Sequence, residues 1–146
     1  MEVPVKVPYK DENGNLRLET LRADRDGEYF KISHVPFWAS NIAVGDVLTA
    51  ELDEGELYYG GHISFAENST IHLVFLNEAN IEEAKGFLSK IGCSVCKLLG
   101  YPYLAVNVLK DVDYSKVREY LKAQEDEGKS SFKESCLSDK HRRDIS

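Results

Sequence analysis

The sequence predicts an α+β protein in which a small N-terminal antiparallel β-sheet, curled or partly closed into a barrel, packs on a C-terminal ferredoxin-like unit. Residues 1–66 contain short alternating runs separated by turn residues and show no helical period. Residues 67–137 follow the order strand, helix, strand, strand, helix, strand, which is typical of a split arrangement with two helices on one face of a four-stranded sheet. A chain of 146 residues is of the length expected for one compact folding unit.

Four or five short strands are expected in the N-terminal part. Valine alternates with other residues over residues 3–7, and Pro4 and Pro8 leave one side of this run without backbone donors, which favours an edge strand. Turn residues then separate strands expected over residues 16–23, 28–33, 47–52 and 57–65. The pair Gly60-Gly61 is expected to bend or bulge the last of these strands.

An apolar corner over residues 34–48 separates the two predicted hairpins. It contains Trp38, the only tryptophan, beside Phe37. Pro36 favours the end of a strand, and Gly45-Asp46 is a turn that leads into a new strand. We expect this corner to join the two halves of the protein, with Phe37 and Trp38 as its packing anchors.

The C-terminal part alternates strand and helix patterns. A buried strand is expected over residues 70–76, followed by a helix with Asn80 as its N-cap and Gly92 at its end. A hairpin over residues 94–109, a helix from Asp113 to Gly128 and a strand over residues 130–137 complete the unit. Residues 138–146 lack an apolar period and are expected to fray.

Several short blocks together resemble a known family. They are His34-Val35-Pro36-Phe37-Trp38 with Gly45-Asp46-Val47, Asn68-Ser69-Thr70, Ile91-Gly92-Cys93, Leu104-Ala105-Val106-Asn107-Val108 and Ser135-Cys136-Leu137. In order and spacing, over about residues 18–137, they resemble the bacterial domain-of-unknown-function family 4265. The chain departs from that family's Ser-Gly-His pattern at Ala66-Glu67-Asn68. The resemblance implies a bacterial origin and a shared fold, and it implies no activity.

Composition limits the classes of partner. The net charge of −7 disfavours binding to nucleic acid or to anionic lipid and favours a basic protein partner. The chain has no apolar run near the roughly 20 residues that a membrane span requires, and it shows no secretory signal, so a cytoplasmic location is expected.

Three cysteines fit a reducing compartment. We expect the pair Cys93 and Cys96 to be structural, because side chains three apart on a strand point to opposite faces.

Catalytic and metal motifs are absent from the sequence. The four histidines have no ligand spacing, and no phosphate loop, nucleophile elbow or paired-carboxylate signature occurs. We therefore expect neither a cofactor, nor a metal, nor an enzyme. His72 within its strand favours a hydrogen-bonded structural histidine, and Asp46 favours a turn carboxylate.

Two hypotheses on function remain. The first is an acidic protein-binding module, such as an immunity or antagonist protein that neutralises a basic bacterial toxin or nuclease. Its candidate contact residues are Asp53, Glu54, Glu56, Tyr58, Tyr59, Tyr101, Glu125, Asp126 and Glu127. The alternative is a small-molecule-binding or enzymatic domain with a pocket between the two β modules, near Trp38, Asp46 and His72. The sequence leaves the oligomeric state open.

Overall fold

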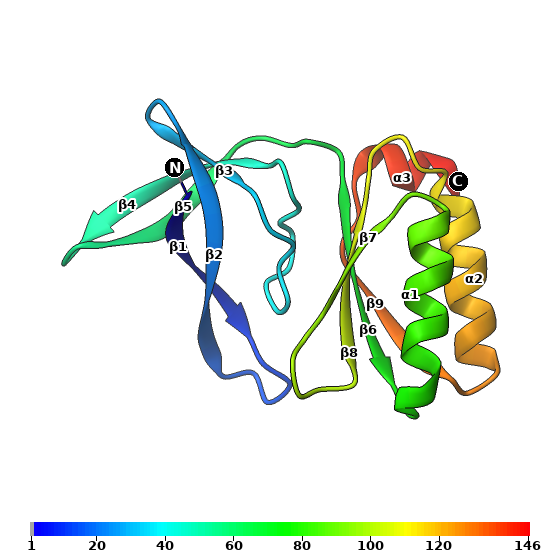
Figure 1. Cartoon of the computed structure of the whole chain (residues 1–146). Coiled ribbons are helices and arrows are strands. Elements are labelled where there is room, and N and C mark those ends of the chain that lie inside the picture. Colours follow the sequence, from blue (N-terminus) through cyan, green and yellow to red (C-terminus); the bar gives the residue numbers. More distant parts are fainter. Residues whose placement is uncertain (1) are drawn as a thin grey trace.

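The computed structural model describes residues 2–146 and places a five-stranded barrel beside a four-stranded sheet (Figure 1). The barrel contains β1 (Glu2–Lys10), β2 (Leu16–Asp26), β3 (Tyr29–Ile32), β4 (Val47–Asp53) and β5 (Glu56–Ser64). The second half contains β6 (Ser69–Phe75), η1 (Glu78–Asn80), α1 (Ile81–Lys90), β7 (Ser94–Lys97), β8 (Tyr103–Val108), α2 (Tyr114–Asp126), β9 (Ser130–Cys136) and α3 (Asp139–Asp144). The predicted α+β class, with an N-terminal curled sheet, is confirmed.

The barrel closes through a parallel pair of strands because it has an odd number of strands. Consecutive strands pair antiparallel from β1 to β5, so the closing pair, β1 with β5, is parallel and joins Val5 to Leu57 and Lys6 to Tyr58. The prediction that β1 is an edge strand is therefore wrong. Pro4 and Pro8 are tolerated because the short pairing with β5 lies between them and needs no donor from either.

A glycine bulge curves the β4–β5 hairpin, as predicted. Thr49 pairs with Gly61 and Ala50 pairs with Tyr59, which leaves Gly60 as an extra residue. A Cβ at Gly60 would lie 2.7 Å from Thr49 Oγ1, so a larger residue would require the Thr49 side chain to move. The barrel core is apolar and consists of Val5, Val7, Leu21, Ala23, Phe30, Ile32, Ala39, Ile42 and Leu48.

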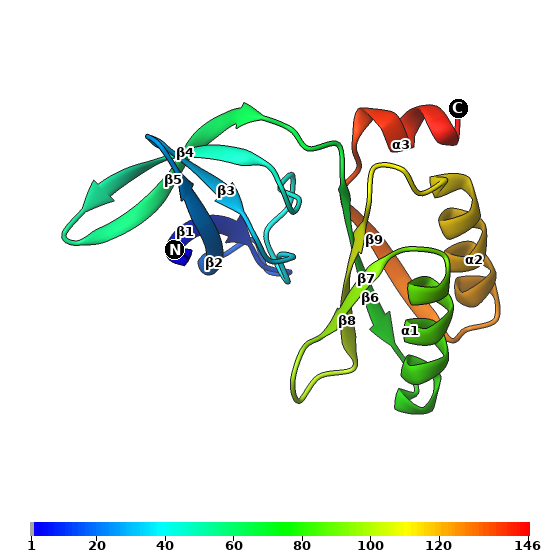
Figure 2. The same cartoon turned by 45° about the horizontal axis from the view of Figure 1, so that its top comes forward.

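The second sheet has the ferredoxin-like strand order β7-β8-β6-β9, with antiparallel neighbours throughout. Helices α1 and α2 cover the face that points away from the barrel (Figure 2). Alternate strand residues such as Ile71, Leu73, Leu104 and Val106 pack in the core on this face. The opposite face points toward the barrel and is polar and aromatic.

The start of the first helix differs from the prediction. Asn80 makes no side-chain cap and instead ends the short 3-10 helix η1. Asn77 provides the cap, because its Oδ1 accepts from Ala79 N at 2.9 Å. Asp113 caps α2 as predicted and accepts from Ser115 N at 3.0 Å. No helix within residues 2–146 is long and apolar enough to cross a membrane.

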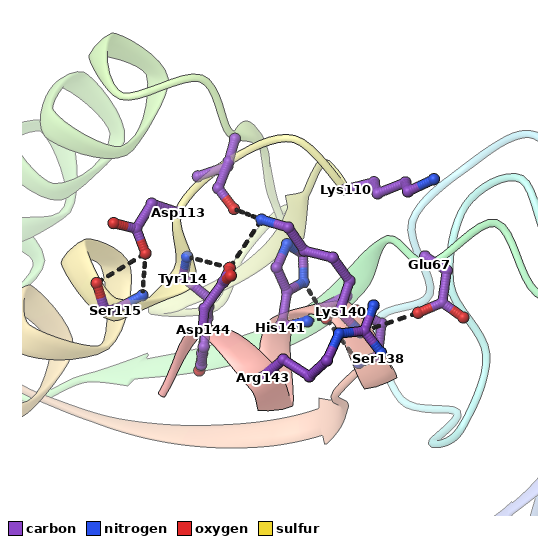
Figure 3. Close-up of polar contacts among 12 residues, drawn as sticks. Glu67, Lys110, Asp113, Tyr114, Ser115, Ser138, Lys140, His141, Arg143 and Asp144 are labelled. Atoms are coloured by element: carbon purple, nitrogen blue, oxygen red, sulfur yellow. Dashed lines mark hydrogen bonds and ion pairs between the residues drawn. The ribbon is translucent and has the colours of Figure 1, made fainter. Parts of the chain in front are cut away.

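The prediction that residues 138–146 fray is wrong. They form α3, which Ser138 caps by accepting from His141 N. His141 is 0% exposed and lies with Nδ1 2.6 Å from Ser69 Oγ and Nε2 3.0 Å from Leu109 O. Charged side chains and their hydrogen bonds lie around this histidine (Figure 3). Lys140 Nζ donates to Asp144 Oδ2 at 2.8 Å and to Val112 O at 3.1 Å. Tyr114 N donates to Asp144 Oδ2 at 3.0 Å, and Lys140 N donates to Glu67 Oε1 at 3.0 Å. Hydrogen bonds to distant segments thus hold this tail in place, although it lacks an apolar period.

Candidate functional site

The corner segment, residues 34–48, joins the barrel to the open face of the second sheet. His72 Nε2 lies 2.7 Å from Pro36 O, and the Tyr103 hydroxyl donates to Phe37 O. Three further bonds of this kind run from Thr70 Oγ1 to Ile42 O at 2.9 Å, from Asn41 N to Ser135 O at 2.8 Å and from Asn68 Nδ2 to Val44 O at 2.8 Å. The segment is the expected junction between the two halves, and hydrogen bonds to its backbone hold it there.

A carboxylate of the barrel fixes the tip of the corner segment. Glu19 Oε2 accepts from Phe37 N at 2.8 Å, and Glu19 Oε1 accepts from Trp38 N at 3.0 Å and from Ala39 N at 2.8 Å. Hydrogen bonds to an ionised acceptor are about twice as strong as neutral ones. Glu19 therefore holds three successive peptide groups, and with them Trp38, in one position.

A cleft of about 590 Å³ lies where the β1–β2 hairpin faces the open side of the second sheet. Its size is in the range of small-molecule sites, roughly 300–1,000 Å³. Its walls are Tyr9, Lys10, Asp11, Glu12, Asn13, Arg17, Trp38, His72, Val74, Tyr103, Ser131, Phe132 and Lys133. Side chains from β1, β2, β6, β8, β9 and the corner segment thus meet in one place.

Aromatic rings form a continuous row along this cleft. The ring centroid of Trp38 lies 4.8 Å from that of Tyr103 and 6.4 Å from that of Tyr9, and the Tyr9 and Trp38 rings are within 15° of parallel. The row continues from Tyr103 to His72 over 5.5 Å. Trp38 packs between Tyr9 of the barrel and Tyr103 of the second sheet, as predicted for the junction, but it remains 40% exposed and is therefore only a partial packing anchor. Its neighbours cover only part of the indole, because the cleft leaves the remainder open to solvent.

His72 is a buried and neutral part of the cleft floor. Because a carbonyl oxygen only accepts, His72 Nε2 carries a proton toward Pro36 O, and Nδ1 accepts from Ser135 Oγ at 2.6 Å. Burial lowers the pKa of the imidazole, and the nearby Lys133 ammonium lowers it further. Since the protein already occupies both ring nitrogens, His72 has no nitrogen available to act as a general base on a ligand.

Asp46, the third residue of the predicted pocket, lies elsewhere. It is 1% exposed, and it accepts from Ala43 N and Ala66 N, each at 3.0 Å. His62 Nε2 lies 3.0 Å from Asp46 Oδ2, and the Tyr59 hydroxyl lies 2.9 Å from His62 Nδ1. Asp46 lines a separate cavity of about 170 Å³. The prediction that Trp38, Asp46 and His72 share one pocket is therefore wrong for Asp46, whose carboxylate is occupied in fixing the turn.

The predicted acidic contact residues are spread over the molecule. Asp53 and Glu54 lie at the β4–β5 turn at one end, and Glu125, Asp126 and Glu127 lie at the end of α2 in the other half (Figure 1). A single partner that met both groups would have to span the barrel and the sheet. The other predicted contact residues also lie apart from α2. Glu56 pairs with Lys6 at 3.0 Å, and Tyr58 and Tyr59 are half-buried in β5. Tyr101 is exposed in the β7–β8 turn. The basic protein partner stays a prediction.

The cysteine pair is divided between the core and the surface. Cys93 is buried in the core beneath the helices, and Cys96 is exposed on β7, so the two side chains do not face each other. Burial raises the pKa of the Cys93 thiol to about 11, which keeps it protonated and unreactive at neutral pH.

Several residues that shape the cleft were not predicted as site residues, among them Tyr9, Lys10, Arg17, Glu19, Tyr103 and Lys133. Tyr9, Lys10 and Lys133 occupy ordinary strand positions, Arg17 and Glu19 alternate on β2, and none belongs to a motif. One weak signal existed, because Tyr9 and Lys10 directly precede a turn and aromatic residues beside turns are often exposed. Only the pairing of distant strands brings these side chains together.

Two buried histidines should make the protein sensitive to mild acid. Burial lowers the pKa of His72 and of His141 below the ordinary value of 6.5. As the pH falls below about 6.5, the unfolded chain takes up protons that the folded chain does not, so the free energy of unfolding should decrease until the pH passes the lowered pKa values. Urea unfolding between about pH 5 and 8 measures this decrease.

Substitution separates these two histidines from other titrating groups. His72→Gln and His141→Gln should each reduce the pH dependence, whereas His34→Gln, which changes an exposed ring, should leave it unchanged. A double variant with His72 and His141 replaced that retains the full pH dependence would contradict this assignment.

The fold and the cleft together define a two-module α+β protein, with a closed barrel docked on a ferredoxin-like sheet. The chain belongs to the family described as a domain of unknown function, DUF4265, whose family model matches residues 19–132. A solved structure described as that of a hypothetical protein from Neisseria gonorrhoeae is similar, with a TM-score of 0.84 and 26% identity over 94% of this chain and 96% of that one. No curated protein matches the chain.

Proposed function

We propose that this protein is a binding module for a small ligand with a planar ring, which it holds in the cleft between the barrel and the second sheet. The observation that carries the proposal is the fixed, half-exposed Trp38. Its backbone is bound by Glu19, and its ring is open toward a cleft of about 590 Å³.

Preorganisation supports a binding role for Trp38. An exposed indole in a mobile loop would lose conformational freedom when a ligand bound, and the loss would reduce affinity. Here Glu19 and Tyr103 hold the peptide groups on either side of Phe37 before any ligand arrives. The neighbouring rings of Tyr9 and Tyr103 provide further faces for stacking.

The row of rings favours binding over chemistry in the cleft. His72 makes no nitrogen available, and the hydroxyl of Tyr103 donates to Phe37 O. Burial raises the pKa of Tyr103, and the Glu19 carboxylate raises it further, so its hydroxyl stays protonated at neutral pH. The groups at the floor of the cleft therefore position one another, and the half-exposed Trp38 is the ring open to a ligand.

Fluorescence of Trp38 reports directly on this cleft, because the chain has one tryptophan. Titration with a panel of small compounds that contain planar rings should give a saturable change in emission for at least one class. Calorimetry on Trp38→Leu should then show a loss of affinity of at least about five-fold, since stacking contributes about 1–3 kcal/mol.

Tyr101→Leu is the matched control, because Tyr101 is an exposed aromatic residue that does not line the cleft. It should bind the same compounds as the unmodified protein. A flat response of Trp38 across the panel, with no compound raising the melting temperature, would overturn the proposal.

A further inference from the structure

Cationic side chains gather at the cleft of an acidic protein. Lys10, Arg17 and Lys133 line it together with the carboxylates of Asp11 and Glu12, and the Glu19 carboxylate beside it is bound by three backbone N–H groups, whereas the whole chain has a net charge of −7. Lysines gathered at one place on an acidic protein attract an anion there, because the surrounding surface repels it.

The ion pair at the β1–β2 turn, between Asp11 and Arg17, leaves Lys10 and Lys133 available to bind an anion. Asp11 Oδ2 accepts from Arg17 Nε at 3.0 Å, and Asp11 Oδ1 accepts from Asn13 N and Asn15 N, each at 2.9 Å. These bonds occupy both oxygens of Asp11 in building the turn. Within residues 2–146, neither Lys10 nor Lys133 forms an ion pair in the structure.

Lys133 stands next to the aromatic floor. It lies directly opposite His72 in the β6–β9 register, so both side chains point to the same face of the sheet. Its positive charge reaches the imidazole, where it contributes to the lowered pKa of His72. Positive charge and ring faces are thus neighbours within one cleft, and a ligand that used both would need a ring and an anionic group.

We propose that the ligand of this cleft is a free mononucleotide or a compound of the same chemistry, with its ring stacked on Trp38 and its phosphate directed to Lys10 and Lys133. This inference rests on the proposed function and names its ligand class. Tyr103 of the central strand β8 presents its ring beside Trp38, as in sheets that stack nucleobases on aromatic side chains. The barrel stands opposite this face of the sheet (Figure 2), and a cleft of about 590 Å³ is of the size for one small ligand.

The test compares compounds that carry one or both groups. Calorimetric titration with adenosine and uridine 5′-monophosphates, the two nucleosides and ribose 5-phosphate should show one or both nucleotides binding about ten-fold more tightly than the corresponding nucleoside or the sugar phosphate. This advantage should shrink as the salt concentration rises, because the lysines are exposed. Replacement of both Lys10 and Lys133 by methionine should remove the advantage and leave nucleoside affinity unchanged.

Replacement of both Lys116 and Lys122, exposed residues of α2 outside the cleft, by methionine is the control for net charge and should keep the advantage. Equal affinity for nucleotide and nucleoside would overturn the role of the anion, and equal affinity for nucleotide and ribose 5-phosphate would overturn the role of the ring. Much tighter binding of a single-stranded oligonucleotide would also overturn the inference. If uncharged ring compounds bind and nucleotides do not, this inference fails while the proposed function stands. If no ring compound binds, both fail.

Discussion

Replacement of Glu19 by alanine is expected to lower the free energy of unfolding by about 3 kcal/mol and to release Trp38. The Glu19 carboxylate accepts from three successive backbone N–H groups, and alanine offers them no acceptor. Hydrogen bonds to charged groups contribute about 1.5–3 kcal/mol each, but the exposed Trp38 N–H can turn to water, so the three losses do not add in full. Urea unfolding measures the loss, and Trp38 anisotropy measures the release.

Glu19→Gln tests whether the charge or the shape of the side chain matters. The amide keeps one acceptor oxygen for Trp38 N and Ala39 N, and it places a donor against Phe37 N, so the loss should be intermediate. Glu28→Ala, which removes an exposed carboxylate from the β2–β3 turn of the barrel, should change stability by less than about 0.5 kcal/mol. Wild-type stability in Glu19→Ala would show that the corner segment is held by its contacts with the second sheet alone.

Removal of residues 138–146 is expected to destabilise the protein by about 3–5 kcal/mol. The deletion removes His141, which is 0% exposed, and leaves Ser69 Oγ and Leu109 O without these partners. It also removes Asp144, the acceptor for Tyr114 N at the start of α2. The midpoint of urea unfolding should fall, and amide exchange should increase at the start of α2.

Two single variants divide this effect. His141→Ala should account for about 2–3 kcal/mol of the loss, since it creates a cavity beside unpaired polar groups. Arg143→Ala should have an effect within about 0.5 kcal/mol, because that side chain is exposed. Unchanged stability of the truncated chain would show that α3 contributes no net stability to the fold.

The sequence predicted elements correctly where local chemistry alone determines them. Asp113 caps α2, Gly92 follows α1 with a φ of 102°, and Gly60 forms the bulge of β5. These features depend on residues within a few positions of one another or on glycine in a strand. Prediction was wrong at Asn80, because an extra 3-10 turn moved the cap to Asn77. The prediction of an edge strand was also wrong. Pro4 and Pro8 fit an unpaired edge, and they fit equally a strand whose pairing is limited to the residues between them.

The candidate site was predicted only in part, for a similar reason. Trp38 and His72 were identified because one is a single tryptophan and the other a polar residue in an apolar strand. Asp46 was placed with them because it lies in the same corner segment, but its Oδ2 lies 3.0 Å from His62 Nε2 of β5 instead. Lys133 carried no usable signal in the chain, and Tyr9 carried only the weak signal of its position before a turn.

The sequence by itself determined the order of the elements, the division into a curled sheet and a ferredoxin-like layer, and the absence of recognisable catalytic motifs. Those properties follow from periodicity and turn chemistry, which act over short stretches of chain. Only the tertiary structure decided that the tail folds and that an aromatic cleft with lysines at its edge exists. His141 meets Ser69 across 72 positions and Glu19 meets Trp38 across 19, and no local pattern records such contacts because they form only when distant strands pair.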